Sequence, residues 1–448
     1  MNARLNSIAE SHTETFEWLF KDVGIDAGGD SLDASQSVAY GLDVKWDNFA
    51  EWLKSGEELY LIEGKAGSGK STLMKFIYNH QKLAGDVLQR AYKGLLATLS
   101  FQIIEHVEDS TVELALEGKV AGSKRSLVDW SESALEDLLF SLLSVLQTSS
   151  LVLIDGLHEF DQDDRPSRLV ALLKKLTSYP GVKLCTSSRP TTWLDWQLSS
   201  AKGLKLQDLT RSDILKYAED VLQEEVGFYV SDLENDGVQG LVYDIQDKAE
   251  GVFLWVKYAL HSIAEGISGM DDLQALKARL LELPKGMYEL YEHTWRRHEN
   301  YNNRHREEAA LCFYCACLSP LSSFEFAVMM DPVLLQHYRD NATPIDENLV
   351  TKTCAQMEQK LKIRTAGLLV CERSNPMDKS GARVSYLHRT VHDFLYETQQ
   401  GRTIVALSNQ TMQNMFQSRI YALVALFVQG HLQLNFQHME QMCKSITH

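Results

Sequence analysis

The chain has 448 residues, enough for about three domains, and 44% of them are hydrophobic, so each domain can bury a core. Its 61 acidic residues outnumber the 44 basic ones, and the net charge of −17 argues against nucleic-acid binding and against adsorption to anionic membranes. Seven cysteines lie scattered without a disulfide framework, and no signal sequence or membrane segment is evident, so we expect a cytoplasmic protein.

We expect lead-in helices and a linker in residues 1–56. A polar, helical stretch ends in the apolar cluster of residues 16–20, and a loop rich in Gly, Asp and Ser follows at 26–37. Residues 46–53 carry apolar side chains at i, i+3, i+6 and i+7, which predicts a short amphipathic helix that leads into the first strand.

A glycine-rich run then fills every required position of the phosphate-binding pattern G-x-x-x-x-G-K-[ST]. An apolar run at 59–62 predicts a buried strand before it, and helical spacing at 73–78 predicts a helix after it. Its residues are Gly64, Lys65, Ala66, Gly67, Ser68, Gly69, Lys70, Ser71 and Thr72.

Such a strand, turn and helix form a cradle for phosphate, because backbone N–H groups converge and the helix N-terminus adds partial positive charge. Lys70 would reach the β- and γ-phosphates, and the Ser71 hydroxyl would bind Mg²⁺. The sequence therefore predicts a nucleotide site, but no motif that specifies the base distinguishes ATP from GTP.

The next signal is a run of four apolar residues, 151–154, which predicts a strand buried on both faces. Asp155 follows at its C-terminal edge, where ligands of open parallel sheets bind. We expect Asp155 to hold Mg²⁺ through its water shell and Glu159 to polarise the attacking water. A third strand, 182–187, is followed by Arg189, whose planar guanidinium suits a sensor of the γ-phosphate.

We expect an α/β unit over 57–205, a helical unit over 206–285, a second unit over 286–400 and a helical tail over 401–448. The second unit has one strand-like run, at 383–387. Cys312, Cys315 and Cys317 lie in an apolar helical stretch without a histidine at ligand spacing, so we interpret them as buried core residues rather than metal ligands.

These elements, in this order, resemble the NACHT family of STAND P-loop NTPases, specifically the nephrocystin-3-like branch of fungal NOD-like receptors. The resemblance lies in TFEWLF (15–20), LIEGKAGSGKSTLMKFI (61–77), LVLIDGLHEF (151–160), KLCTSSRP (183–190), LQDLTRSDILKYAEDVL (206–222), KAEGVFLWVKYAL (248–260), LPKGMYELYEHTW (283–295) and YLHRTVHDFL (386–395). It implies an α/β P-loop domain followed by a helical domain and a winged-helix domain.

The resemblance also assigns a role to His388, which would approach the β-phosphate of bound ADP. His392, four residues later, is interpreted as an ordinary residue of a helix surface.

Two departures from the family pattern affect these expectations. The family typically has Asp where this chain has His158, which removes a negative charge near Mg²⁺, so hydrolysis would be slow or lost. Residues 79–92 contain no run that favours a strand, so we expect the sheet to lack one edge strand.

The resemblance implies a signalling switch that binds ATP or GTP with Mg²⁺, rests with ADP or GDP, and is at most a slow NTPase. Activation would bring self-association and contact with effector and sensor proteins, as in fungal innate immunity or heterokaryon incompatibility. The chain begins near the NACHT lead-in and ends before any sensor repeats. Two alternatives remain open: a degenerate nucleotide-binding scaffold without turnover, and a P-loop phosphotransferase.

Overall fold

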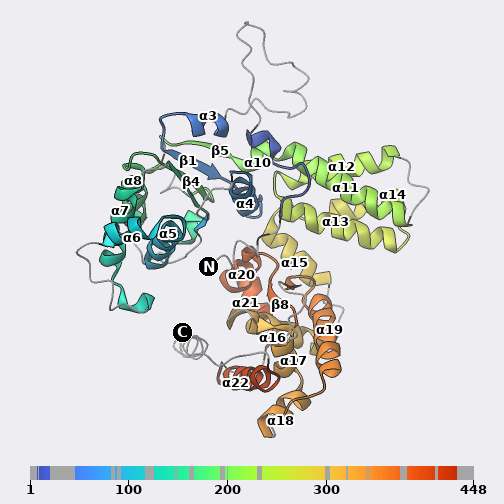
Figure 1. Cartoon of the computed structure of the whole chain (residues 1–448). Helices are drawn as coiled ribbons and strands as arrows, with labels where there is room; N and C mark the ends of the chain where they lie inside the picture. The colour runs from blue at the N-terminus through green and yellow to red at the C-terminus, as the bar shows by residue number, and fades with distance from the viewer. Residues whose placement is uncertain are drawn as a thin grey trace. The chain divides into compact units, whose positions relative to one another are not determined.

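The computed structural model describes most of the chain, in two compact units, Met1–Glu282 and Leu283–His448 (Figure 1). The described residues are 8, 10–20, 46–81, 86–87, 92–116, 126–146, 149–160, 166–191, 197–198, 200–229, 235–297, 303–318, 321–340, 343–373, 381–408 and 412–430. The predicted loop at 26–37 lies outside them, and so does the end of the predicted helical tail.

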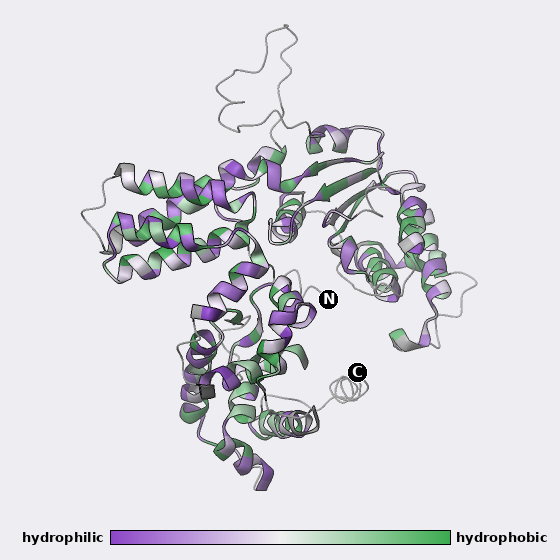
Figure 2. Ribbon diagram, turned by 180° about the vertical axis from the view of Figure 1, so that it is seen from behind, coloured by the Kyte–Doolittle hydropathy of each residue, from purple (hydrophilic) through white to green (hydrophobic). Residues whose placement is uncertain are grey.

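The first unit contains a five-stranded parallel sheet with the strand order β2-β3-β4-β1-β5. Its strands are β1 (Leu59–Glu63), β2 (Asp86–Val87), β3 (Ser150–Ile154), β4 (Val182–Ser188) and β5 (Lys202–Lys205). The three strands predicted from apolar runs are thus confirmed as β1, β3 and β4, and with them the α/β class. Figure 2 shows this sheet mostly in the colour of hydrophobic residues, as expected for strands covered on both faces.

The expected loss of an edge strand is wrong. β2 pairs with β3 through Asp86 opposite Leu153 and Val87 opposite Ile154. Pairing of this kind uses backbone N–H and C=O groups and therefore does not require a run of β-branched or aromatic side chains. The edge of the sheet beside β3 is covered by a strand of two residues.

Helices cover both faces of the sheet. The side chains of β1 point alternately to the two faces, and each set packs against a different group of helices. The side chains of Tyr60 and Ile62 belong to one hydrophobic cluster, and that of Leu61 belongs to the other, because successive residues of a strand point to opposite faces. The first cluster includes residues of η1 (Glu17–Phe20), α3 (Phe49–Lys54) and α4 (Lys70–Gln81). The second includes residues of α5 (Tyr92–His106), α7 (Glu132–Val145) and α8 (Pro166–Thr177), and α6 (Asp109–Leu116) packs on α7.

Local sequence fixes where several of these elements begin. Asn48 accepts a hydrogen bond from the backbone N–H of Glu51 and caps α3, and Ser131 caps α7 through the N–H of Ala134. The short 3-10 helices η2 (Leu127–Asp129) and η3 (Leu157–Glu159) precede α7 and follow β3.

Helices complete the first unit. They are α10 (Leu206–Leu209), α11 (Arg211–Tyr229), α12 (Asn235–Ala249), α13 (Phe253–Ser268) and α14 (Leu273–Glu282). α11 packs against α12 and α13, and α13 packs against α14. Between α12 and α13 the chain turns at Gly251, which has a φ of +79° and lies so close to the Gln207 carbonyl that a Cβ there would be 2.2 Å from its oxygen. Only glycine fits this turn.

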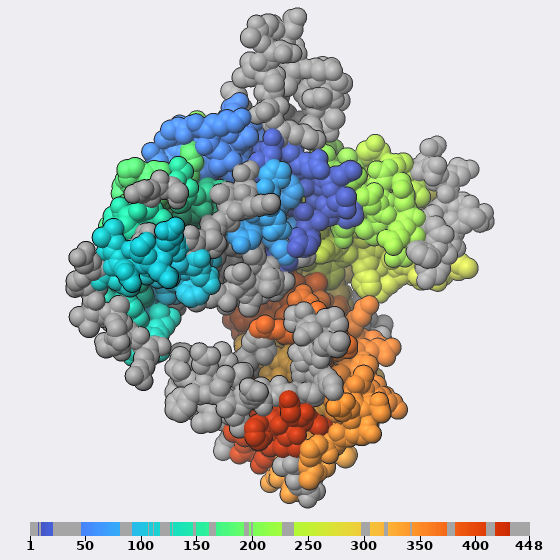
Figure 3. Space-filling view, viewed as in Figure 1, coloured from blue at the N-terminus to red at the C-terminus, as the bar shows by residue number. Residues whose placement is uncertain are grey.

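The N-terminal segment ties the sheet to these helices (Figure 3, dark blue). The indole N–H of Trp18 donates to Asp213 of α11 at 2.8 Å, and Asp213 is 5% exposed. The ring of Phe16 contacts Phe76 of α4 and Phe253 of α13, with centroids 6.0 Å apart in both pairs.

The second unit is mostly helical around a three-stranded antiparallel sheet with the order β6-β8-β7. Its elements are α15 (Met287–Arg297), α16 (Asn303–Leu318), β6 (Leu321–Ser322), α17 (Ser323–Met330), α18 (Pro332–Asp340), α19 (Glu347–Arg364), β7 (Leu369–Glu372), β8 (Arg383–Tyr386), α20 (Arg389–Glu397), α21 (Gln399–Val405) and α22 (Met412–Val428). The predicted strand at 383–387 is confirmed as β8, whereas β6 and β7 are additional.

The interpretation of the cysteines on α16 is wrong for one of them. Cys312 and Cys315 are buried, but Cys317 is exposed. An α-helix turns by about 100° per residue, so Cys317 lies about 140° around the helix from Cys312 and faces away from the core. Among the described residues no group of three or more His, Cys, Asp or Glu side chains could hold a metal ion.

Candidate functional site

The P-loop between β1 and α4 has the backbone geometry that phosphate binding needs. Gly67 and Gly69 have φ values of +76° and +97°, in the left-handed region that side chains disfavour. These conformations curl the loop over the N-terminus of α4, whose orphan N–H groups attract anions.

The Ser68 hydroxyl adds a polar atom to this loop. The residue is 0% exposed, and within the described chain its hydroxyl has no hydrogen-bond partner. A buried polar group without a partner costs about 1–3 kcal/mol. A phosphate oxygen bound in the loop would remove that cost, so this residue fits the nucleotide that the motif predicts.

Lys70 is folded back onto the same loop. Its ammonium group donates to the carbonyl oxygens of Gly64 at 2.7 Å and Lys65 at 2.9 Å. Burial lowers the pKa of Lys70 to about 8. The carboxylates of Asp155 and Glu159 act to raise this pKa, and the positive charge of Arg189 acts to lower it. Four predicted site residues are therefore close enough to influence one another electrostatically.

Asp155 lies at the end of β3 and is 4% exposed. One carboxylate oxygen accepts from the Ser71 hydroxyl at 2.5 Å, and the other accepts from the Ser187 hydroxyl. Ser187 in turn accepts from the backbone N–H of Gly156 at 3.0 Å. A carboxylate beside a serine hydroxyl is the set of hard oxygen ligands that Mg²⁺ prefers, so these residues fit the expected ion.

Ser187 was missed by the sequence reasoning. It lies at the end of β4, two positions before Arg189, within a run that was interpreted only as a strand. The parallel pairing of β3 and β4 aligns their C-terminal ends, which is what brings this hydroxyl to Asp155.

The remaining predicted groups surround the turn after β3. Gly156 has a φ of +78°, and a Cβ there would lie 3.3 Å from the side chain of Glu159, which folds back beneath it. The Nδ1 atom of His158 accepts from the backbone N–H of Arg189 at 3.1 Å, and its Nε2 atom lies 4.0 Å from Glu159. The side chains of His158 and Glu159 are each only 11% exposed.

A direct contact joins the P-loop to the first turn of α13. The backbone N–H of Leu254 donates to the carbonyl of Gly67 at 3.1 Å, and a Cβ at Gly67 would lie 2.8 Å from the Leu254 Cβ. Lys65 pairs with Glu250 at 3.2 Å, and its backbone N–H donates to Gln207 at 3.2 Å. The sequence reasoning gave none of these contacts a role, because they join segments that lie 142 to 187 positions apart in the chain.

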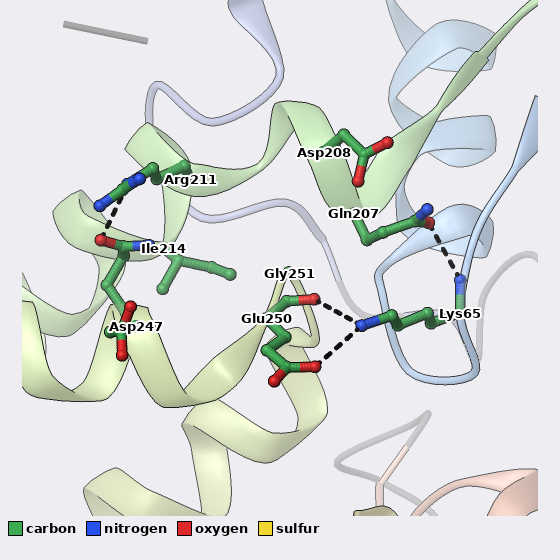
Figure 4. A pocket seen from close by; sticks show the side chains of 9 residues that line it. Lys65, Gln207, Asp208, Arg211, Ile214, Asp247, Glu250 and Gly251 are labelled. Atoms are coloured by element: carbon green, nitrogen blue, oxygen red, sulfur yellow. Dashed lines mark hydrogen bonds and ion pairs between the residues drawn. The ribbon is translucent and has the colours of Figure 1, made fainter. Parts of the chain in front are cut away.

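A pocket of about 320 Å³ lies beside this contact (Figure 4). It is lined by Lys65, Gln207, Asp208, Arg211, Ile214, Gln246, Asp247, Glu250 and Gly251. Lys65 is the single P-loop residue in this lining, so the pocket adjoins the phosphate-binding loop rather than forming it.

His388 belongs to the second unit, where it caps α20. Its Nδ1 atom accepts from the backbone N–H of Thr390 at 3.2 Å, so the proton of the neutral ring is on Nε2. The Thr390 hydroxyl lies 2.9 Å from the same Nδ1 atom and 2.6 Å from the hydroxyl of Tyr291, and both these residues are fully buried. This network fixes the ring and makes Nε2 a hydrogen-bond donor.

Comparisons with known proteins agree with the geometry of the first unit. Residues 44–189 match the family model described as nephrocystin 3, N-terminal, and residues 303–437 match a domain of unknown function (DUF7791). No curated protein sequence matched the chain.

Solved structures give weaker similarities. A STAND protein with a tetratricopeptide repeat sensor from Pyrococcus horikoshii is 12% identical, with a TM-score of 0.40, covering 96% of this chain and 54% of that one. The ORC1 protein from Aeropyrum pernix in complex with DNA is 12% identical, with a TM-score of 0.33, covering 79% of this chain and 91% of that one. Cdc6p from Pyrobaculum aerophilum is 11% identical, with a TM-score of 0.32, covering 87% of this chain and 97% of that one. With TM-scores below 0.5, these similarities support no functional conclusion.

No helix in the described parts of the chain combines the length and the apolar character needed to cross a membrane.

The family match and the candidate site fall in the same part of the chain. Residues 44–189, which match the family model, contain the P-loop, the Asp155 carboxylate and the end of β4. Residues 44–189 form a P-loop domain that is similar to the N-terminal domain of nephrocystin 3.

Proposed function

We propose that the chain is a nucleotide-dependent switch in which the P-loop reports its occupancy to the helices that follow the sheet. The supporting observation is the contact of the P-loop with the first turn of α13, made by Gly67 and Leu254. A loop that changes shape around two or three phosphates would shift this contact, and the two nucleotides would then favour different conformations by their difference in affinity.

The same residues support binding more strongly than hydrolysis. Lys70, Ser71 and Asp155 supply the groups for phosphate and Mg²⁺, with ATP or GTP as the nucleotide. The resemblance implies a carboxylate where this chain has His158, and the Nδ1 atom of His158 accepts from the backbone N–H of Arg189. We propose that Glu159 alone polarises water, with Arg189 sensing the γ-phosphate, and that turnover is slow.

His388 is proposed as the group of the second unit that binds the β-phosphate of a diphosphate. Its Nε2–H can donate to a phosphate oxygen, because Nδ1 is occupied by the N-terminus of α20. The order of elements from α16 to β8, with the sheet order β6-β8-β7, supports the winged-helix assignment of this unit.

The proposal includes the setting that the resemblance implies. An opened chain would self-associate and engage effector and sensor proteins in the cytoplasm, in signalling of the kind that serves fungal innate immunity or heterokaryon incompatibility. A switch of this kind retains its nucleotide tightly and turns it over slowly.

The test is to purify the chain, extract and identify any bound nucleotide, and measure turnover, with Lys70→Ala as the control. We expect about one nucleoside diphosphate per chain, lost in Lys70→Ala, and slow hydrolysis. Substantial transfer of phosphate to an acceptor would contradict the switch and support a phosphotransferase.

One observation favours a second candidate, a scaffold that no longer cycles. The resemblance implies an acid at the position of His158, and the Nε2 atom of His158 lies 4.0 Å from Glu159. If the chain contains no nucleotide and Lys70→Ala changes neither its stability nor its partners, the scaffold is the better description.

A further inference from the structure

The second unit contains a cysteine whose surroundings are unlike those of the other cysteines in the described chain. Cys317, near the end of α16, is exposed, whereas Cys185, Cys312, Cys315 and Cys354 are buried. The Cys317 sulfur lies 3.9 Å from the Nε2 atom of His392 on α20.

His392 is itself oriented by a carboxylate. Its Nδ1 atom lies 3.8 Å from Asp393, whose side chain is 6% exposed, while the imidazole is 41% exposed. Arg389 also contacts the Asp393 carboxylate, at 3.6 Å. A buried carboxylate next to one ring nitrogen favours the protonated imidazole, which then faces the sulfur with its other nitrogen.

Aromatic side chains hold the imidazole in place. The rings of Tyr386 on β8 and Tyr396 on α20 lie 5.6 and 4.8 Å from the His392 ring, centroid to centroid. Both tyrosine hydroxyl groups donate to the carbonyl of Phe313 on α16, at 2.6 and 3.3 Å. These bonds link the helix that carries Cys317 to the elements that carry and flank His392.

The protonation states follow from these contacts. The hydrogen bond with His392 lowers the pKa of the Cys317 thiol, and so, by less, does one with Tyr396. Although the residue is exposed, its neighbours shield the sulfur partly from water, which acts in the opposite direction. The contacts with Asp393 and Cys317 raise the pKa of His392 to about 9. Burial raises the pKa of the nearby Cys315 thiol and of the Tyr314, Tyr386 and Tyr396 hydroxyls, so these four groups stay neutral near pH 7.

We propose that Cys317 is a reactive thiolate, paired with the His392 imidazolium, and that hydrogen peroxide oxidises it to a sulfenic acid. The sulfur attacks one peroxide oxygen, an S–O bond forms and the O–O bond breaks. Sulfur is oxidised by two electrons, which reduce the peroxide. The leaving hydroxide takes the proton of His392 Nε2 and departs as water, so the ion pair becomes a neutral Cys–SOH beside a neutral imidazole.

Oxidation would therefore remove the charge interaction between α16 and α20, the helix that His388 caps. The site does not depend on the proposed nucleotide switch, because none of its residues belongs to the P-loop domain.

Cys371 on β7 is a matched control within the same chain. It is half-buried, and burial raises the pKa of its thiol to about 11. Cys317 titrates below its ordinary value of 9.0, so near pH 7 its thiolate fraction exceeds that of Cys371 by at least about 100-fold. A less basic thiolate is also a weaker nucleophile, and a pKa lower by two units reduces its reactivity by about tenfold. The larger thiolate fraction outweighs this loss, so Cys317 should react at least about tenfold faster than Cys371.

The experiment alkylates the reduced full-length chain with iodoacetamide near pH 7 and follows each cysteine peptide by mass spectrometry. A parallel sample receives hydrogen peroxide and dimedone, which traps sulfenic acid. We expect alkylation of Cys317 at least about tenfold faster than that of Cys371, and dimedone on Cys317. Equal alkylation rates, or no dimedone on Cys317, would overturn the proposal.

His392→Gln tests the pairing, since the half-exposed side chain can be replaced without opening the core. Loss of the imidazolium should slow the alkylation of Cys317 by about threefold or more and leave Cys371 unchanged. A pH profile gives a readout independent of folding defects: the apparent pKa of Cys317 should be lower in the native chain than in guanidinium chloride. An unchanged rate in His392→Gln, or equal pKa values in the two solvents, would refute the pairing.

Discussion

The low pKa of Lys70 makes a quantitative prediction about nucleotide binding. Burial lowers this pKa to about 8 in the free protein, where the ammonium group donates to two carbonyl oxygens of the loop. Phosphate oxygens favour the charged form, so binding should return the pKa toward its ordinary value of 10.5. The lysine must therefore take up a proton when nucleotide binds at mildly alkaline pH.

The pH dependence of ADP binding follows from the coupling between binding and protonation of Lys70. A base with a pKa of about 8 is about nine-tenths protonated at pH 7, half protonated at pH 8 and one-tenth protonated at pH 9. Binding of ADP should thus take up about half a proton at pH 8, and its Kd should rise about tenfold between pH 7 and pH 9. Below pH 7 this group should contribute almost no pH dependence.

The assay is isothermal titration calorimetry of the nucleotide-free chain with ADP and Mg²⁺, in buffers that differ in ionisation enthalpy. Lys70→Arg is the matched control, because a guanidinium stays charged throughout this range and should abolish the slope. A wild-type Kd that changes by less than about twofold between pH 7 and pH 9, with heats independent of the buffer, would refute the reasoning.

Three further variants test the geometry around the site. Ser187→Ala leaves a buried oxygen of Asp155 without its donor and should lower the free energy of unfolding by about 1–3 kcal/mol, measured by urea denaturation; an unchanged midpoint would contradict that contact. His158→Asp restores a carboxylate near Mg²⁺ and should raise phosphate release in a steady-state assay; a rate equal to that of the wild type would show that His158 does not limit turnover. Gly67→Ala places a Cβ against Leu254 and puts a non-glycine residue at a positive φ, so it should destabilise the first unit by about 1–3 kcal/mol and lower its Tm. A variant with an unchanged Tm would mean that the loop does not pack tightly against the first turn of α13.

Much of the first unit was predictable because its signals are local. Apolar runs gave β1, β3 and β4, and the P-loop pattern gave the turn and the start of α4. Asp155 could be placed at the right sheet edge because parallel strands present their C-terminal ends together. β2 could not be predicted, since its two residues pair through the backbone alone and leave no side-chain pattern.

The contacts missed by the sequence reasoning are those that depend on distant segments. Ser187 contacts Asp155 only because β4 pairs with β3, and Leu254 reaches Gly67 across about 187 positions. The exposure of Cys317 was misjudged because hydrophobic neighbours suggested burial, whereas the helical angle turns its side chain outward. His392 was interpreted as an ordinary surface residue, because nothing in its local sequence indicates the cysteine 75 positions earlier.

The nucleotide bound to the purified chain tests the central claim most directly. We denature the protein without added nucleotide, identify what is released and compare Lys70→Ala. The account predicts about one nucleoside diphosphate per wild-type chain and almost none from the variant, with slow hydrolysis when triphosphate is supplied. A wild-type chain that neither contains nor binds nucleotide, or that transfers phosphate rapidly to an acceptor, would contradict it.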